Sequence, residues 1–220
     1  METPDTILKN MFCSYPELES LSGDIRSAYR MLVNCYDLGG IVLCCGNGGS
    51  AADADHIVGE LMKGFMLKRP LSNSIARRFF GTPGSRHLAA SLQGALPAIS
   101  LTGQAALISA FANDVSPDMV YAQQVLGYGT GREALLIALS TSGNSVNIVR
   151  AVETAACLKI PSIAITGAAG GMLKDLATLC LRMPADETFR VQEYTLPVYH
   201  ALCAMVEVHY FAENEPCGQR

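Results

Sequence analysis

Residues 41–53, with the sequence Ile-Val-Leu-Cys-Cys-Gly-Asn-Gly-Gly-Ser-Ala-Ala-Asp, indicate the fold of this chain. The apolar run Ile41–Cys45 shows no alternation with polar residues, which is typical of a strand covered on both faces. A glycine-rich loop, Gly46–Ser50, follows it and leads into a stretch with helical spacing, Ala51–Phe65. A strand, a tight loop and a helix in this order form the repeating unit of parallel α/β sheets.

The same alternation continues along the chain. Further apolar runs predict strands at Pro97–Leu101, Ala134–Leu139, Pro161–Thr166 and Thr178–Met183. The stretches between them show helical spacing at Ala105–Leu126, Val146–Leu158 and Met172–Leu176. Strands linked by helices predict an α/β layer fold with a parallel sheet and right-handed crossovers. A chain of 220 residues fits one domain, residues 1–220, with a substantial core.

Helices are also expected before and after this alternation. Glu17–Leu38 precedes the first strand and ends at two glycines, a good stop signal. Phe189–Phe211 forms a long apolar helix, and Pro197 inside it should kink or locally open that helix. The tail Ala212–Arg220 is expected to fray.

One segment, Lys68–Leu96, departs from the alternation. It is rich in glycine, proline and serine, and it carries a group of basic side chains: Arg69, Arg77, Arg78, Arg86 and His87. We interpret it as an insertion or long excursion between the first helix and the second strand. Long loops often serve as lids or interface elements, but a solvated loop with helical pieces fits the pattern equally well.

The composition excludes several classes of protein. Half of the residues are hydrophobic and 16% are charged, which is far more apolar material than a disordered chain has. A net charge of −4 gives no broad electrostatic footprint for nucleic acid or an anionic membrane. No apolar run approaches bilayer length, and the amino terminus does not resemble a signal peptide. The eight cysteines form no CxxC pair and fit core positions in a reducing cytoplasm.

Two loops have the composition of an anion site. In Gly46–Ser50 the glycines permit close backbone approach, and Ser50 is placed to cap the helix and offer a hydroxyl. A tight turn without a ligand would look similar. The second loop, Ser140-Thr141-Ser142-Gly143-Asn144-Ser145, supplies hydroxyl and amide donors that suit a phosphate dianion. Both loops follow strands, at the usual ligand edge of open α/β sheets.

Four side chains on two predicted helices have metal-ligand chemistry. His56 and Glu60 lie about 40° apart around their helix, and Gln192 and His200 lie about 80° apart around theirs. Two imidazoles, a carboxylate and an amide oxygen are able to bind a divalent metal such as zinc. The same spacing also fits a surface i,i+4 pair together with a hydrogen-bonded core histidine.

Several stretches match one family in order along nearly the whole chain. They are Cys45–His56, Glu60-Leu61, Ala112-Asn113-Asp114, Leu139–Ser145, Thr166-Gly167, and Arg190–Glu193 with His200. In these stretches the chain resembles the sugar isomerase (SIS) domain family. Within that family it is most similar to the sedoheptulose 7-phosphate isomerases, also called phosphoheptose isomerases.

The resemblance implies a five-stranded parallel sheet flanked by helices, a flavodoxin-like three-layer sandwich, in a homotetramer with sites at subunit interfaces. It implies Glu60 as the general base and His200 as its acid partner. Phosphate binding is implied for Ser140, Thr141, Ser142 and Ser145. Contacts with the sugar are implied for Asn47, Gly48, Gly49, Ser50, Glu60, Asn113, Asp114 and Gln192. Zinc, one per subunit, would be held by His56, Glu60, Gln192 and His200.

The implied reaction is an aldose–ketose isomerisation of sedoheptulose 7-phosphate to D-glycero-D-manno-heptose 7-phosphate. A proton moves between C1 and C2 through an enediol, which requires a positioned base. The competing hypothesis is a non-catalytic SIS module that binds a phosphosugar or a replication-initiator protein. Such a module has no need for Glu60 and His200 together, and no attached DNA-binding segment is visible.

Three features depart from the family pattern. Members often carry an acidic residue three positions before the glutamine, where this chain has Phe189. Pro197 interrupts the stretch between Gln192 and His200, and Lys68–Leu96 is longer than the family normally carries there. All three bear on the identity of the substrate more than on the class of reaction.

Overall fold

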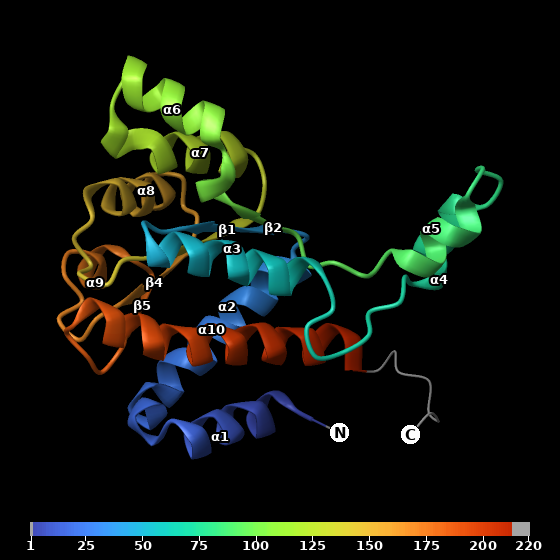
Figure 1. Cartoon of the computed structure of the whole chain (residues 1–220), viewed down its shortest axis with the longest axis horizontal. Coiled ribbons are helices and arrows are strands. Elements are labelled where there is room, and N and C mark those ends of the chain that lie inside the picture. Colours follow the sequence, from blue (N-terminus) through green and yellow to red (C-terminus); the bar gives the residue numbers. More distant parts are fainter. Residues whose placement is uncertain (1, 213–220) are drawn as a thin grey trace.

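A computed structural model describes residues 2–212 of the chain as a single α/β domain. Five strands form one parallel sheet in the order β2-β1-β3-β4-β5 (Figure 1). The predicted sheet is confirmed, and its strands are β1 Ile41–Cys45, β2 Ala98–Ser100, β3 Ala134–Leu139, β4 Ser162–Thr166 and β5 Leu179–Arg182. Apart from Ala212, the predicted frayed tail lies outside the described residues.

Helices cover both faces of the sheet, which explains why the strands carry no alternating pattern. On one face lie α2 (Ser22–Asp37), α3 (Gly49–Met62) and α10 (Thr188–Phe211), and α1 (Pro4–Ser14) packs on the outside of α10. On the other face lie α6 (Ala105–Asp114), α7 (Val120–Gly129), α8 (Val146–Cys157) and α9 (Leu173–Leu176) (Figure 1). The three-layer architecture is therefore confirmed.

The strand order reverses direction next to β1. The chain passes from β1 to β2 at one edge and then returns to place β3 on the other side of β1. At such a switch point the loops after the two neighbouring strands diverge and leave a crevice where ligands bind. Cys45 pairs with Ala138, so the two predicted phosphate loops begin side by side.

Two helix predictions differ from the structure. The stretch 105–126 contains two helices, because a turn at Val115, the extended residue Ser116 and the 3₁₀ segment Pro117–Met119 separate α6 from α7. Ser116 is extended, with φ −166°, as expected for a residue that precedes proline. The predicted helix 17–38 begins as the 3₁₀ segment Pro16–Leu21 before α2.

Two further differences from the predictions concern the helices near the two ends of the chain. Helix α1 was not predicted, although Thr3 and Thr6 form a capping box around Pro4 at its start. Helix α10 continues through Pro197 as one uninterrupted element, so the predicted opening of the helix is wrong (Figure 1). No helix among residues 2–212 is long and apolar enough to cross a membrane.

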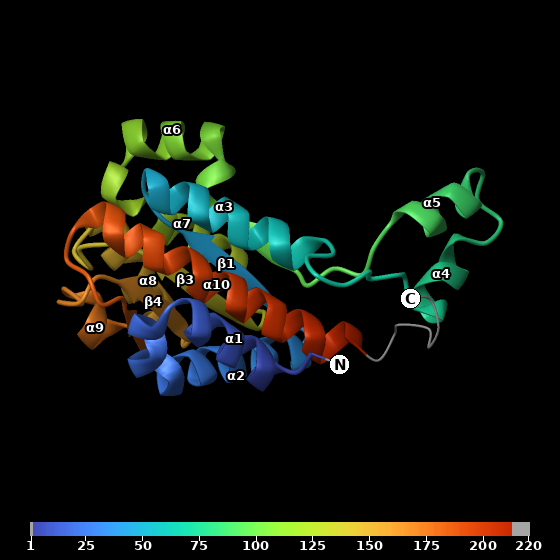
Figure 2. The same ribbon diagram turned by 60° about the horizontal axis from the view of Figure 1, so that its bottom comes forward.

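The excursion between α3 and β2 extends away from the body of the domain (Figures 1 and 2). It contains α4 (Asn73–Ala76), the 3₁₀ segment Arg77–Phe79 and α5 (Ser85–Ser91). Its base is closed by a bridge between Pro70 and Gln93 and by a 2.7 Å hydrogen bond from the Gly94 amide to the Arg69 carbonyl. We call residues 71–92 the arm; none of them is buried.

Replacing residues 72–91 by a short Gly-Ser linker should leave the domain folded. Because the ends of the arm lie side by side and no arm residue enters the core, we expect Tm to change by less than about 3 °C. Thermal unfolding followed by circular dichroism measures the change. The buried-core variant Leu135→Ala, which should lose about 2–5 kcal/mol, provides the contrast. A drop in Tm as large as that of Leu135→Ala would show that the arm supports the fold.

Candidate functional site

The loop after β1 is shaped by its glycines. Gly48 has φ +56°, a left-handed conformation that suits glycine, and it forms the N-cap of α3. Ser50 therefore lies inside the first turn, where it is buried, and does not cap the helix as predicted. A Cβ on Gly46 would lie 2.3 Å from the Ser50 carbonyl oxygen, so the turn is too tight for any side chain there.

The loop after β3 is a compact set of hydroxyl and amide groups. The Ser140 hydroxyl donates to the Ser145 hydroxyl at 3.0 Å, and the Asn144 amide donates to the Ser142 hydroxyl at 3.1 Å. Ser145 forms the N-cap of α8, and no side-chain bond caps that helix. The first amides of α8 and the surrounding hydroxyls therefore provide donors for an anion at the positive end of the helix.

A pair of asparagines links the two loops. The Asn47 side-chain amide donates to Asn147 Oδ1 at 2.8 Å, and the Asn147 amide donates back to Asn47 Oδ1 at 2.9 Å. This reciprocal pair spans the crevice at the switch point. Asn147 was not predicted as a site residue, since nothing in the sequence marks a partner one hundred positions from Asn47.

Helices α3 and α10 bring three of the predicted catalytic and metal-ligand residues together. His56 Nε2 lies 3.2 Å from Glu60 Oε1 and 3.5 Å from His200 Nε2. The side chain of Glu60 is 11% exposed, and its other carboxylate oxygen accepts from Lys63 Nζ at 3.2 Å. The predicted base and its acid partner therefore share one cluster, although they lie on different helices.

His56 is oriented by a chain of polar contacts. The Tyr199 hydroxyl donates to Asp53 Oδ1 at 3.2 Å and lies 3.0 Å from His56 Nδ1. With its proton directed to Asp53, this hydroxyl is able to accept from an Nδ1–H of His56, and the Nε2 atom of His56 faces Glu60 and His200. The sequence did not single out Tyr199, because it sits within the apolar pattern of the last helix.

The environment also sets protonation in this cluster. Burial lowers the pKa of His200 below its ordinary value, and the neighbouring His56 lowers it further, while Glu60 opposes the shift. Both burial and His56 therefore favour the neutral form of the His200 imidazole. Burial raises the pKa of Asp53, against the opposing effects of the Tyr199 hydrogen bond and His56.

Three predicted residues lie apart from this cluster. The Asn113 and Asp114 side chains, at the end of α6, hydrogen-bond to each other at 2.8 Å. Gln192 packs against Gly49, where a Cβ would lie 2.5 Å from its Nε2. Gln192 and His200 are eight positions apart on α10, a rise of about 12 Å along the helix. In this structure the Gln192 amide therefore lies beside Gly49 and apart from the His200 imidazole.

The donor set of the cluster suits zinc in part. Two ligands of a tetrahedral zinc with bonds of about 2.0–2.1 Å lie about 3.3 Å apart, close to the two distances around His56 Nε2. An imidazole lone pair facing a carboxylate also favours a cation between them. Within residues 2–212, however, no group of three or more His, Cys, Asp or Glu side chains is arranged so that it could hold a metal ion.

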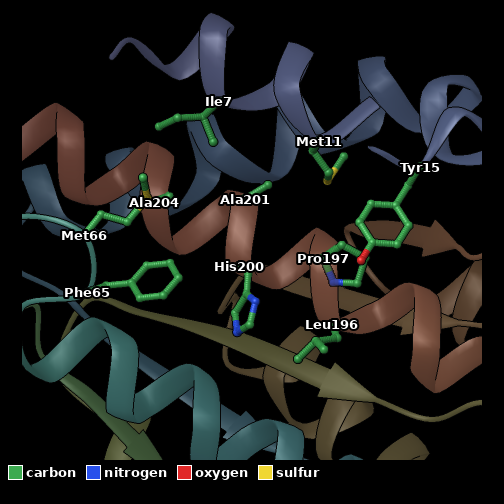
Figure 3. Close-up of a pocket in the computed structure, with 10 residues that line it drawn as sticks. All are labelled: Ile7, Met11, Tyr15, Phe65, Met66, Leu196, Pro197, His200, Ala201 and Ala204. Atoms are coloured by element: carbon green, nitrogen blue, oxygen red, sulfur yellow. The ribbon is translucent and has the colours of Figure 1, made fainter. Parts of the chain in front are cut away.

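An open apolar cavity of about 270 Å³ lies on the other side of His200, between α1 and α10 (Figure 3). Figure 3 shows the imidazole of His200 beside the ring of Phe65, and their ring centres are 5.4 Å apart. The rim includes Tyr15, Met66 and Leu196, each at least 40% exposed. The residues that line this cavity include His200 and none from the loops after β1 and β3.

Comparison with known proteins connects this geometry to a family. Models of the SIS domain match residues 15–90 and 93–208. The phosphoheptose isomerase of Akkermansia muciniphila is 34% identical over 88% of this chain and 89% of its own length. The phosphoheptose isomerase of Helicobacter pylori is 33% identical over 96% of this chain and 99% of its own length.

Solved structures agree with this relationship. A phosphoheptose isomerase from Francisella tularensis superposes with a TM-score of 0.72 at 32% identity, over 88% of this chain and 90% of that one. The phosphoheptose isomerase from Neisseria gonorrhoeae gives a TM-score of 0.66 at 31% identity, over 90% of this chain and 94% of that one. The sequence and structure comparisons thus identify relatives of the same kind, and the chain belongs to the SIS domain family, among the phosphoheptose isomerases.

Proposed function

We propose that this protein converts sedoheptulose 7-phosphate to D-glycero-D-manno-heptose 7-phosphate by proton transfer through an enediol. The names of its relatives indicate the substrate class. The observation that carries the reaction is the cluster of Glu60, His56 and His200, within 3.2–3.5 Å contacts between two helices. A module that only binds a phosphosugar has no need of a base and an imidazole held together in this way.

Separate sets of residues bind the substrate and transfer the proton. Ser140, Thr141, Ser142 and Ser145 bind the phosphate through hydroxyls and helix-start amides. The sugar is contacted by Asn47, Gly48, Gly49, Ser50, Asn113, Asp114 and Gln192. Glu60 moves the proton between C1 and C2, and neutral His200 donates its ring proton toward the carbonyl oxygen and assists ring opening.

Zinc is the proposed cofactor, with His56, Glu60 and His200 of one chain as ligands. Their spacing near the tetrahedral edge length supports this assignment. When bound, the metal polarises the carbonyl oxygen of the sugar. Gln192, on the same helix as His200, is the proposed fourth ligand through its side-chain oxygen.

We also propose a homotetramer with sites at subunit interfaces, which the family resemblance supports. The open apolar cavity beside His200 is a surface that a neighbouring subunit would cover. A cytoplasmic location is supported by the unbonded state of seven cysteines among the described residues, as a reducing compartment would maintain it.

Substituting Glu60→Gln should abolish turnover and preserve the fold, because the amide keeps the shape of the carboxylate and cannot accept the proton. We expect kcat for sedoheptulose 7-phosphate to fall by at least about 100-fold. The control Glu153→Gln removes an exposed carboxylate paired with Arg150 on α8 and should keep full activity. Retained turnover in Glu60→Gln would contradict the base assignment. Phosphosugar binding without turnover in the wild type would favour the non-catalytic module.

Zinc should bind at about one ion per chain after chelator treatment and dialysis. Removing a ligand in His56→Ala should weaken zinc binding by more than about tenfold. The control His87→Ala changes an exposed histidine in the arm and should leave the affinity unchanged. Calorimetric titration with zinc measures both. Equal affinity in wild type and His56→Ala would place the metal elsewhere.

A further inference from the structure

Glu60 lies in the last turn of α3, where the backbone hydrogen bonds of a helix are incomplete. The helix ends at Met62, and Lys63 is already extended, with φ −136° and ψ 171°. The last four carbonyls of a helix have no amide partner within that helix. A base in this turn therefore depends on outside donors to keep its backbone in place.

Arg69 supplies two of these donors from a buried position, and the Leu96 amide supplies another, to the Leu61 carbonyl at 3.0 Å. The Arg69 Nη2 donates to the Glu60 carbonyl at 3.0 Å, and its Nη1 donates to the Leu61 carbonyl at 2.7 Å. Its Nε donates to Glu207 Oε1 at 2.7 Å. The planar guanidinium thus joins the end of α3 to α10 in a geometry that an ammonium group does not reproduce.

Glu207 organises the chain that follows α3. Its carboxylate accepts from the amides of Phe65, Met66 and Leu67 at 2.8, 2.7 and 3.1 Å. Neither charged side chain of the pair is exposed, so the loss of either partner would leave a buried charge without compensation. Glu207 follows His200 by seven positions, which is close to two helical turns, so both lie on nearly the same side of α10.

Residues 63–67, whose backbone this pair holds in place, contact both Glu60 and His200. Lys63 Nζ lies 3.2 Å from Glu60 Oε2, and the Phe65 ring lies 5.4 Å from the His200 ring. A shift of the segment would therefore move the carboxylate and the imidazole relative to each other.

We propose that Arg69 and Glu207 are positioning residues of the isomerase, which hold the last turn of α3 against α10 and so set the placement of Glu60 relative to His200. The proposal rests on the proposed function. It differs from a purely stabilising role, because a stabilising pair would lower Tm without a selective loss of turnover.

Arg69→Lys is the direct test. The single ammonium keeps the positive charge opposite Glu207 but cannot serve that carboxylate and both carbonyls in the same way. We expect kcat to fall by about tenfold or more, since small misplacements of catalytic groups are costly. KM should stay within about twofold, because the phosphate loops are untouched. Hydrogen exchange should accelerate at the amides of the last turn of α3.

Two further variants keep the test decisive. Glu207→Gln retains a carbonyl acceptor for the loop amides, removes the charge and should give the same loss of kcat. Ile25→Val opens a small gap in the core beneath α2 and should lower Tm while keeping kcat. Unchanged kcat in both pair variants would overturn the proposal. So would a kcat loss no greater than that of Ile25→Val, or failure of both pair variants to fold.

A wild-type protein without turnover would overturn the proposed function instead. Hydrogen exchange in the last turn of α3 then decides the positioning claim by itself. Unchanged exchange in Arg69→Lys would refute it, and faster exchange confined to that turn would support it.

Discussion

The parallel pairing of β1 with β3 is the constraint on which the site depends. It places Cys45 beside Ala138, so that two loops of different composition leave the sheet at adjacent points. One loop is made tight by glycines, and the other is rich in hydroxyl groups. The Asn47–Asn147 pair then bridges them. An anion at this point is bound by backbone amides and hydroxyls, which is how a chain with a net charge of −4 can bind a phosphate.

Packing of α3 against α10 provides the second half of the site. Helix α3 starts in the first loop and carries His56 and Glu60 toward its far end, where α10 presents His200. In the proposed function the loops bind the phosphate, and the helix pair carries the residues that transfer the proton. The continuous helix α10 places Gln192 beside Gly49 in the first loop and His200 beside His56.

The sequence was most informative where structure is set by neighbouring residues. Unbroken apolar runs predicted the strands, and the glycine and serine loops predicted after the first and third strands do follow β1 and β3. Local signals failed at Ser116, where the residue before a proline is extended and divides one predicted helix into two. They also failed at Pro197, because the packing of α10 along its length keeps the helix continuous.

Sequence patterns do not show which side chains pair when they are far apart along the chain. Arg69 and Glu207 are 138 residues apart, and each looks like an ordinary surface charge until the fold buries both. Tyr199 likewise reads as one apolar residue among many, yet its hydroxyl connects Asp53 to His56. The reaction class was implied by the family resemblance, whereas the contacts that orient the residues required the three-dimensional arrangement.

The most direct test of the account is isomerisation carried out in deuterium oxide and followed by NMR. If Glu60 transfers a proton between C1 and C2 through an enediol, sedoheptulose 7-phosphate should yield heptose 7-phosphate with deuterium at C2. That label arises because the proton on the base exchanges with solvent before it is returned. Phosphosugar binding with neither product nor deuterium incorporation would contradict the assignment of an isomerase site.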